Sequence, residues 1–455
     1  MAMRADVVVI GMGPGGEEVA GRLAEEGLDV VGIERDLVGG ECPYWGCIPS
    51  KMAIRAANLL AEARRIPGVA GTSTVTPDWT PVAARIRDEA TDNWDDRVAV
   101  ERFVGKGGRF ARGEGRIVAP GRVEVGDDVI EAGRAIVVAT GARSVIPDIP
   151  GLAEAGYWTN REALEAKELP ASLIVLGGGA VGLELGQAFA RFGVAVTILE
   201  STDRVLPMAE PEVGEILRDV LRADGISIRC GSTAQRVERV ASGVEVTLTD
   251  GSVVRGEQLL VSAGRRPDPV AVGLDAIGVP VDARGAVPVD DHLRVAPSVW
   301  ALGDVTGKGG FTHVAMYQAQ IVVAAILGRE HAPADYRALP KVTFTDPEVG
   351  AVGLTAAAAR AAGFDVRVGR AAVPSSARGW IHKVGNEGIV VLVADVARDV
   401  LVGATAVGPT GGEVLGLLTL AIHAETPLSM LRTMMYAYPT FHRAVEDALR
   451  DLDAS

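Results

Sequence analysis

Apolar and polar positions near the N-terminus form blocks that predict a strand, a turn, a helix and a second strand. Residues 7–10 and 30–33 are short apolar runs, as in buried parallel strands. The turn between them carries three spaced glycines: Gly11, Gly13 and Gly16. They suit a tight turn, close approach of a pyrophosphate, and packing of helix on strand, and Glu34 after the second run can accept from a ribose. This block predicts a dinucleotide site.

The same block occurs a second time. Apolar runs at residues 173–176 and 194–199 flank a helical segment at 183–192. Its turn again carries three glycines: Gly177, Gly179 and Gly182. The acid Glu200 follows the last glycine by 18 residues, the same spacing as in the first block. Two such blocks predict two bound dinucleotides.

Further apolar runs end in residues with candidate chemistry. Residues 135–139 form a predicted strand that ends at Thr140 and Gly141, and residues 299–304 form another that ends at Asp304. A proline-punctuated stretch at 147–151 is typical of a domain boundary. From residue 336 the pattern changes to a separate α+β domain, with strands and helices in the following ranges: 341–345 and 389–395, then 411–424 and 440–452.

Composition narrows the class of protein. The 455 residues are enough for about three domains. The net charge of −14 disfavours binding to nucleic acid or an anionic membrane. The N-terminal apolar run is too short for a signal peptide, and no apolar run approaches the length of a membrane span. We therefore expect a cytoplasmic protein with no membrane or nucleic-acid partner.

Three cysteines are present: Cys42, Cys47 and Cys230. They are too few for a four-thiolate metal site, and the first two form a C-x4-C pair without a nearby histidine, so we expect no metal. In a cytoplasmic protein such a pair is more often redox-active than structural. Two unlinked cysteines remain an alternative. Cys230 has no partner in sequence and is interpreted as an ordinary, partly buried thiol.

The ordered motifs resemble the pyridine nucleotide–disulfide oxidoreductases, the family of dihydrolipoamide dehydrogenase, mercuric reductase and soluble transhydrogenase. The resemblance covers essentially the whole chain and rests on these segments: 11–16, 40–51, 139–141, 177–182, 264–267, 301–304 and 346–350. It implies an α/β fold with two Rossmann-like domains, for FAD and NAD(P), and a C-terminal α+β dimerisation domain that forms a homodimer. The expected divisions are residues 1–150 (FAD), 151–268 (NAD(P)), 269–335 (completing the FAD domain) and 336–455 (dimerisation).

The resemblance also implies roles for single residues. Cys47 would be the thiol beside the flavin and Cys42 the thiol that exchanges with substrate, while Lys51 and Glu184 would form an ion pair beside the site of hydride transfer. The residues expected at FAD are Gly11, Gly13, Gly16, Glu34, Gly115, Thr140, Gly141, Asp304 and His313. Those expected at NAD(P) are Gly177, Gly179, Gly182, Glu200 and Gly264. Because Glu200 would repel a 2′-phosphate, NADH is favoured over NADPH.

The C-terminal segment departs from the family pattern. Disulfide reductases of this family carry a histidine, then Pro-Thr, then a glutamate; here Tyr438 and Arg443 stand at the His and Glu positions. A phenol with a pKa of about 10 is a poor base at neutral pH. His442 and Glu446 lie four residues apart on the helix expected from 440, so they form either a replacement acid/base dyad or an ordinary surface pair. Both interpretations stay open.

The electron acceptor is also open. No cysteine follows Cys230, so mercuric reductases with a C-terminal cysteine pair and large thioredoxin reductases fit poorly. The first hypothesis is electron flow from NADH through FAD and the Cys42–Cys47 disulfide to a small-molecule or small-protein acceptor of disulfide type. The second is direct transfer from flavin to a quinone, a metal ion or another nucleotide, with a non-essential disulfide. The third is a non-enzymatic docking role.

Overall fold

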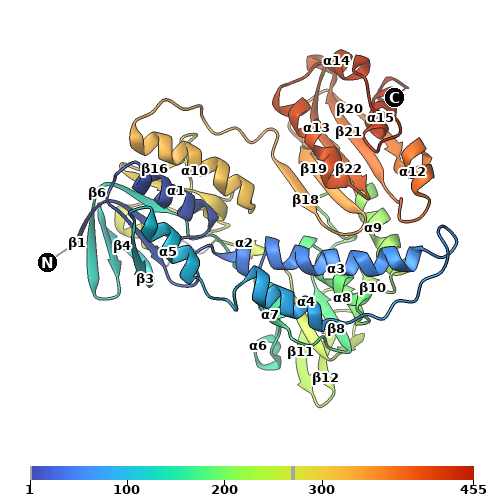
Figure 1. Cartoon of the computed structure of the whole chain (residues 1–455), viewed down its shortest axis with the longest axis horizontal. Helices are drawn as coiled ribbons and strands as arrows, with labels where there is room; N and C mark the ends of the chain where they lie inside the picture. Colours follow the sequence, from blue (N-terminus) through green and yellow to red (C-terminus); the bar gives the residue numbers. More distant parts are fainter. Residues whose placement is uncertain (1–2, 268–271, 455) are drawn as a thin grey trace. The chain divides into compact units, whose positions relative to one another are not determined.

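The computed structural model describes residues 3–267 and 272–454, and the chain forms two compact units (Figure 1). Unit 1 comprises Met1–Pro49, Ala84–Val145 and Gly264–Asp335; unit 2 comprises Ser50–Ala83, Ile146–Ala263 and Tyr336–Ser455. Unlike in the predicted division, residues 50–83 group with unit 2, and the NAD(P) and dimerisation segments form one unit. The predicted boundary at 268–269 lies outside the described residues, and the four-part division stays a prediction.

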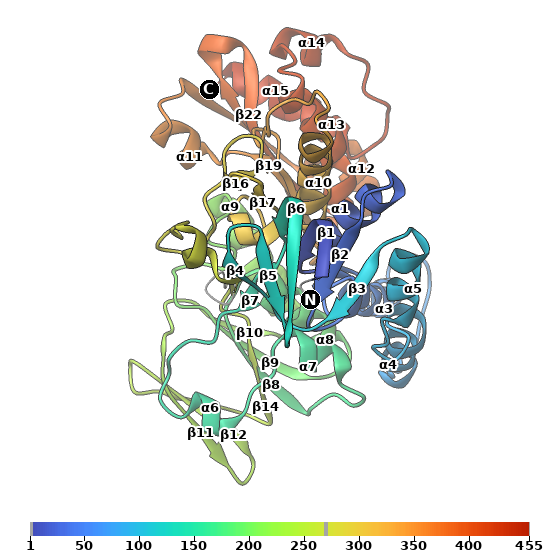
Figure 2. The same ribbon diagram turned by 90° about the vertical axis from the view of Figure 1, so that its left-hand side faces the viewer.

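Unit 1 is built on a largely parallel sheet in the order β16-β17-β6-β1-β2-β3. Its strands are β1 (Met3–Ile10), β2 (Val30–Glu34), β3 (Arg109–Arg112), β6 (Asp128–Val138), β16 (Arg294–Ala296) and β17 (Val299–Ala301). The central strand β1 pairs in parallel with both neighbours, with Val7 opposite Val30 and Ala135. Strands β6, β1 and β2 lie side by side in Figure 2. The first predicted strand–helix–strand block is therefore present.

The two faces of this sheet are covered differently. Helices α1 (Pro14–Glu25), α5 (Arg97–Gly105) and α10 (Thr312–Leu327) contribute side chains to the core on one face, and α1 and α10 lie side by side in Figure 1. Strands β4 (Gly115–Ala119) and β5 (Arg122–Val125) contribute to the core on the other. Short elements of unit 1 include α2 (Glu41–Tyr44), η1 (Ile86–Ala90), β7 (Arg143–Ser144), β15 (Arg265–Arg266), η3 (Leu274–Ile277) and η4 (Gly303–Thr306). Asp304 lies in this last turn because β17 ends at Ala301, earlier than predicted.

Unit 2 contains the second predicted block. Its parallel sheet has the order β10-β9-β8-β14, made of β8 (Ser172–Leu176), β9 (Ala195–Leu199), β10 (Ser227–Arg229) and β14 (Gln258–Val261). The helices α8 (Ala180–Arg191) and α9 (Pro211–Ala223) follow β8 and β9. An antiparallel sheet of β11 (Ala234–Val240), β12 (Gly243–Leu248) and β13 (Val253–Gly256) shares its core with the parallel sheet and with α6 (Leu152–Ala155). Helix α7 (Asn160–Glu165) begins with a capping box at Thr159.

The C-terminal part of unit 2 is an antiparallel sheet in the order β18-β19-β22-β21-β20. The strands are β18 (Pro340–Thr343), β19 (Glu348–Gly353), β20 (Val366–Ala372), β21 (Ile389–Asp395) and β22 (Val400–Gly408). One face packs on α13 (Gly411–His423), α14 (Leu428–Thr433) and α15 (Arg443–Ala454), and the other on α11 (Ala356–Ala361). Helix α12 (Ala377–His382), η5 (Val373–Ser375) and η6 (Val396–Arg398) connect the strands. The expected α+β organisation of this segment is confirmed.

The last helix begins later than predicted. The Thr440 hydroxyl donates to the carbonyl of Ala437 at 2.7 Å, and the amide of Val445 donates to the carbonyl of His442 at 3.0 Å. Residues 440–442 are therefore a turn, and α15 starts at Arg443. The expectation that His442 and Glu446 share this helix was wrong, because His442 precedes its first residue.

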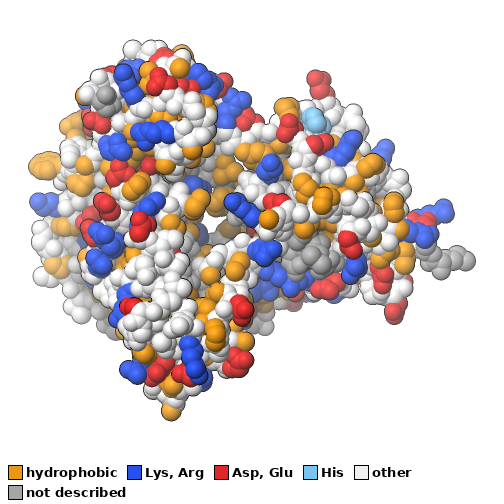
Figure 3. Space-filling model, turned by 180° about the vertical axis from the view of Figure 1, so that it is seen from behind, with side chains coloured by type: hydrophobic (Ala, Val, Ile, Leu, Met, Phe, Trp, Pro, Cys, Tyr) orange, Lys and Arg blue, Asp and Glu red, His pale blue; other side chains and the backbone are white. Residues whose placement is uncertain are grey.

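Within residues 3–267 and 272–454, no helix combines the length and the apolar character needed to cross a membrane. On the face drawn in Figure 3, acidic and basic side chains lie interspersed over much of the surface.

Candidate functional site

The first glycine-rich turn of unit 1 is held in a conformation that requires glycine. Gly11 has φ +92°, and a Cβ there would lie 2.5 Å from the carbonyl oxygen of Ala139. A Cβ on Gly16 would collide with the carbonyl of Gly11, whereas a Cβ on Gly13 would meet open space. The turn is thus packed against its own strands at two glycines and open at the third, which leaves the backbone accessible at the start of α1.

Glu34 holds this turn from the end of β2. Its carboxylate accepts from the amide of Met12 and from the amide of Asp36, each at 2.8 Å. Glu34 is only half-buried. The carboxylate is therefore fixed in orientation at the position where the sequence predicted a ribose contact.

Two further predicted residues of unit 1, Thr140 and Asp304, carry polar groups whose burial is not fully compensated inside the protein. The Thr140 hydroxyl is buried without a hydrogen-bond partner among the described residues. Burial raises the pKa of Asp304, and Arg265, whose Nε lies 3.8 Å away, offsets this only in part. Buried polar groups are normally satisfied, so a hydroxyl and a carboxylate left in this state fit a ligand that carries hydrogen-bonding groups.

The two cysteines expected to form the redox pair are brought together. Cys42 lies in α2 and Cys47 begins helix α3 (Cys47–Arg65), which starts in unit 1 and continues in unit 2. Both are free thiols and are hydrogen-bonded to each other. The hydrogen bond with Cys47, together with burial, raises the pKa of Cys42 far above that of an ordinary thiol. The pair therefore retains a proton at Cys42 when it is reduced.

Thr312 is a contact of this pair that the sequence did not indicate. Its hydroxyl lies 3.6 Å from the Cys47 sulfur and also lowers the pKa of Cys42 in part. Thr312 is the first residue of α10, and neighbouring His313 stacks on Phe311 with ring centroids 5.2 Å apart. Unit 1 thus places a hydroxyl beside the thiols and an imidazole in the same turn.

Trp94 is a second such contact. Its indole N–H donates to the carbonyl of Tyr44, inside the Cys42–Cys47 loop, at 3.3 Å. Trp94 belongs to three consecutive residues with left-handed backbone, at φ +48°, +56° and +56°, directly after the π-helix η1. The buried Asp96 anchors this segment by accepting from the amide of Val38 at 2.7 Å and from Arg112 at 2.5 Å. Strained segments of this kind are concentrated at functional sites.

In unit 2, Lys51 and Glu184 form the ion pair that was expected. The ammonium of Lys51 donates to the Glu184 carboxylate at 2.8 Å and lies 4.6 Å from the centroid of the Phe344 ring. The other oxygen of Glu184 accepts from the amide of Phe344 at 2.8 Å. Glu184 is buried, so both of its oxygens are compensated inside the protein.

A buried charge network next to this pair was not predicted. Asp346 accepts from Arg65 and from Arg191, each at 2.7 Å, although its segment was noted only as a family motif. Gln187 exchanges two hydrogen bonds with the backbone of Asp346, both at 2.8 Å. The side chain of Arg191 is 2% exposed, and it also contacts Asp224 at 3.0 Å. Helix α8 is therefore tied to the β18–β19 connection by charge as well as by packing.

The second glycine-rich turn repeats the first. A Cβ on Gly177 would lie 2.5 Å from the carbonyl oxygen of Ser262, and one on Gly179 would meet open space. Glu200 accepts from the amide of Gly178 at 2.7 Å and from that of Thr202 at 2.8 Å. A Cβ on Gly182 would collide with the carbonyl of Gly177, just as a Cβ on Gly16 would collide with the carbonyl of Gly11 in the first turn. Two equivalent dinucleotide turns are therefore present, one in each unit.

The remaining predicted glycines are in unit 1. Gly115 begins β4, and a Cβ there would lie 3.0 Å from the Ile10 side chain. Gly264 directly precedes β15 and so belongs to unit 1, whereas the other expected NAD(P) residues lie in unit 2.

At the C-terminus, Tyr438 is 68% exposed, and the Arg443 guanidinium lies 5.3 Å from the centroid of its ring. The residues at the family's His and Glu positions thus form a cation–π contact. Glu446 contacts Arg443 at 3.1 Å and is hydrogen-bonded by Arg450. No hydrogen bond or ion pair of the His442 imidazole is found in the described part of the chain. The structure links Glu446 to arginines and not to the imidazole.

Comparison with known proteins gives the family. The sequence model described as "Pyridine nucleotide-disulphide oxidoreductase" matches residues 5–319, and that of the family's dimerisation domain matches residues 339–449. The chain belongs to this family. Its members are FAD-dependent NAD(P)H oxidoreductases, and the expected fold class and enzyme class are confirmed.

Curated relatives and solved structures agree with this assignment. The chain is 34% identical to dihydrolipoyl dehydrogenase 2 of Haloarcula marismortui, covering 97% of this chain and 95% of the relative. It is 32% identical to mercuric reductase of Bacillus cereus, covering 98% and 71%. The HOCl-induced flavoprotein disulfide reductase RclA from Escherichia coli superposes with a TM-score of 0.85 at 27% identity, covering 98% of this chain and 99% of that one. LpdA from Mycobacterium tuberculosis does so with the same score and identity, covering 99% and 100%.

The residues of unit 1 fit FAD. The open backbone at Gly13, the fixed carboxylate of Glu34, the unsatisfied hydroxyl of Thr140 and the partly compensated Asp304 are the groups that a phosphate, a ribose and a polyhydroxyl chain would use. The Gly179 turn and Glu200 fit a nicotinamide nucleotide in the same way.

Proposed function

We propose that this enzyme uses NADH to reduce the Cys42–Cys47 disulfide through FAD, and that the dithiol then reduces a disulfide-type acceptor. The observation that supports this best is the contact of the two thiols with each other and with Thr312, in the unit that carries the first dinucleotide turn. The net reaction is NADH + H⁺ + R–S–S–R giving NAD⁺ + 2 R–SH, so two electrons and two protons reach the acceptor.

Bound FAD would supply the chemistry of accepting a hydride and delivering two electrons to a disulfide. The protein's part is to hold the thiols and to manage protons. Cys47, in contact with Thr312, is proposed as the thiol on the flavin side, and Cys42 as the thiol that attacks the acceptor. Because Cys42 holds its proton tightly, attack requires a base.

His442 is the candidate for this base. Imidazole is the side chain that enzymes use most often as a general base, and a phenol is a poor one at neutral pH. The described ion pairs of Glu446 favour a surface role for that carboxylate, so we propose His442 without an orienting acid. Lys51 and Glu184 are proposed to position the nicotinamide nucleotide where its hydride leaves.

NADH is proposed as the donor because of Glu200. Its carboxylate, buried at the end of β9, would repel a 2′-phosphate. The first cation after it, Arg204, is engaged by Asp203 at 3.3 Å and by the Pro207 carbonyl at 3.0 Å. These contacts of Arg204 compete with any contact to a 2′-phosphate.

The match to a dimerisation domain supports a homodimer, which we propose as the working assembly. A cytoplasmic location stays a prediction.

The thiol steps are tested with serine variants of single cysteines. Cys42→Ser is expected to lower turnover with a disulfide such as lipoamide at least about 100-fold, while NADH still bleaches the flavin under anaerobic conditions. Cys230→Ser, which removes the third thiol, is the matched control and should behave like the native enzyme. Unchanged disulfide turnover in Cys42→Ser would contradict the proposal.

A second candidate is direct transfer from flavin to a metal ion or a quinone. The Tyr438–Arg443 contact favours it, because it stands where family members that reduce disulfides carry a base. RclA, which is similar in structure, has been solved as a Cu(II) complex, and a mercuric reductase is among the relatives. NADH-dependent reduction of a quinone or Cu(II) that survives in Cys47→Ser would support this candidate; loss of that activity would exclude it.

A further inference from the structure

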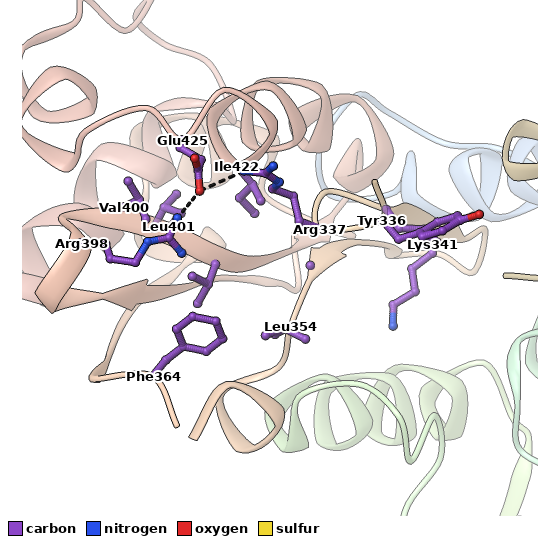
Figure 4. A pocket seen from close by; sticks show the side chains of 13 residues that line it. Tyr336, Arg337, Lys341, Leu354, Phe364, Arg398, Val400, Leu401, Ile422 and Glu425 are labelled. Atoms are coloured by element: carbon purple, nitrogen blue, oxygen red, sulfur yellow. Dashed lines mark hydrogen bonds and ion pairs between the residues drawn. The ribbon is translucent and has the colours of Figure 1, made fainter. Parts of the chain in front are cut away.

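A cavity of about 330 Å³ lies in the C-terminal part of unit 2 (Figure 4). None of its lining residues belongs to the dinucleotide turns, the cysteine pair or the Lys51–Glu184 pair. Its walls come from the end of β19, the start of β22, the end of α13, and β18 with the segment that leads into it. Volumes of this order are typical of small-molecule sites.

Most of the lining is apolar. Leu354 and Phe364 line the cavity together with Val400, Val402 and Ile422, the last three of which are almost fully buried. At roughly 30 Å³ per water molecule, the cavity has room for about eleven waters, and so for a ligand of about ten non-hydrogen atoms. An apolar cavity of this size favours a ligand with a hydrocarbon body.

One polar rim of the cavity is built around Glu425. This residue follows α13 with a left-handed backbone, φ +47°, where glycine is the usual residue. Its carboxylate contacts Arg337 at 3.0 Å and is also hydrogen-bonded by Arg398, as the dashed lines of Figure 4 show. Arg398 also lies 4.0 Å from the buried carboxylate of Asp395, so the two guanidinium groups of this rim are balanced by two carboxylates.

Lys341 supplies a positive charge to the lining. Its side chain lies beside Tyr336, on the side of the cavity away from Glu425 (Figure 4). Burial lowers the pKa of Lys341, and no charged group counteracts that effect. The backbone of Lys341 pairs with β19, but its ammonium makes no hydrogen bond or ion pair within residues 3–267 and 272–454. A half-buried ammonium without a carboxylate is costly, and an anion would compensate it.

We propose that this cavity binds a small amphipathic carboxylate, with its head group at Lys341 and its hydrocarbon body against Leu354 and Phe364. The charge-balanced Arg337–Glu425–Arg398 cluster closes the polar rim, so Lys341 is the positive charge that selects an anionic head group. The cavity is too small and too apolar for a nucleotide, and inorganic phosphate would leave its apolar walls without contact.

Equilibrium dialysis of octanoate against the full-length, FAD-loaded enzyme tests the proposal. Octanoate has ten non-hydrogen atoms, and its Kd is expected on the order of 0.1–1 mM. Octanamide, the neutral counterpart, and inorganic phosphate, the anion without a hydrocarbon body, should each bind at least about tenfold more weakly. Equal binding of octanamide, or no octanoate binding at millimolar concentration, would overturn the proposal.

Variants locate the site. Lys341→Met keeps most of the length of the side chain but removes the charge, and should weaken octanoate binding at least about tenfold, whereas Lys341→Arg, which keeps a charge, should retain most of the binding. Lys167→Met, at an exposed lysine, is the matched control and should bind as the native enzyme does. Leu354→Phe fills the cavity without changing charge and should also abolish binding, which keeps the test valid if Lys341→Met does not fold. Octanoate binding unaffected by both Lys341→Met and Leu354→Phe would place the ligand elsewhere and refute the site.

Discussion

Replacing Asp346 by asparagine separates the charge of the network in unit 2 from its shape. The amide keeps the size of the side chain and an oxygen that can accept a hydrogen bond. It loses the negative charge that lies 2.7 Å from the guanidinium groups of both Arg65 and Arg191. Arg191, at 2% exposure, cannot recover this energy from water.

The expected loss of stability depends on which carboxylate partners each arginine retains in the variant. Breaking a buried ion pair by removing one partner costs about 3–5 kcal/mol. Arg191 retains Asp224 at 3.0 Å, and Arg65 retains the partly exposed Glu62 at 2.6 Å. We therefore expect a loss of about 2–4 kcal/mol in local stability, which is roughly 30-fold to almost 1,000-fold in the opening equilibrium. For comparison, exposed ion pairs contribute only about 0–1 kcal/mol to the free energy of unfolding.

Hydrogen exchange resolved to peptides is the suitable assay, because a chain of two units does not unfold in one step. Peptides from α8 and from the β18–β19 connection should lose protection in Asp346→Asn. Peptides from β1, in unit 1, should not. The control is Glu101→Gln, the same chemical change in the exposed Arg97–Glu101 pair, whose side chains are 62% and 63% exposed.

Equal, small effects of Asp346→Asn and Glu101→Gln would refute the reasoning, since the buried network would then contribute no more than a surface pair. A loss of protection spread evenly over β1 and α8 would refute the local assignment.

Three further predictions concern the redox site. Trp94→Phe removes the indole donor to the Tyr44 carbonyl and should increase hydrogen exchange of the Cys42–Cys47 loop by a factor that corresponds to about 1 kcal/mol. The control Trp380→Phe, at a residue that is 73% exposed, should leave this exchange unchanged. Equal exchange in the two variants would exclude the indole hydrogen bond as an anchor of the loop. His442→Ala should lower disulfide turnover about 10²–10⁴-fold at pH 7 without slowing flavin reduction by NADH. Because the raised pKa keeps Cys42 protonated, the rate of disulfide turnover lost in His442→Ala should return by about tenfold for each unit by which the pH rises. Stopped-flow assays measure flavin reduction by NADH, and steady-state assays measure disulfide turnover. An equal effect of the substitution on both would rule out His442 as a base. Glu200→Ser should raise the NADPH-to-NADH ratio of kcat/KM by about tenfold or more, and an unchanged ratio would remove the charge argument for NADH.

Local patterns in the sequence were enough for the two dinucleotide turns. The backbone conformation itself requires glycine at positions such as Gly11, and the apolar runs on either side have the length of buried strands. Both features lie within about 30 consecutive residues, so they can be recognised without knowledge of the tertiary structure. The Cys42–Cys47 contact is local for the same reason. The Lys51–Glu184 pair spans 133 residues, and it could be expected only from the resemblance to a family.

The features that were missed depend on contacts between distant segments. Asp346 meets Arg65 and Arg191 across 281 and 155 residues, and nothing in the periodicity of α3 or α8 marks these arginines as its partners. The start of α15 was misjudged because Thr440, a good capping residue by type, donates its hydroxyl backwards to Ala437. Side-chain choices of this kind are decided by tertiary structure.

The sheet of unit 1 has a consequence for synthesis of the chain on the ribosome. Strand β17 pairs in parallel with β6, yet about 160 residues separate the two strands, and α10, which packs on α1, comes later still. Strand β5 pairs with Asp128–Glu131 at once, but at roughly 5–20 residues per second the end of β6, Ile136–Val138, waits about 10–30 s for β17. The parallel sheet of unit 2, contained in residues 172–261, is complete before then. The nascent flavin domain therefore presents a short, unpaired, apolar strand end at Ile136–Val138 while the later domain is already able to form, and this end is open to wrong pairing until β17 arrives.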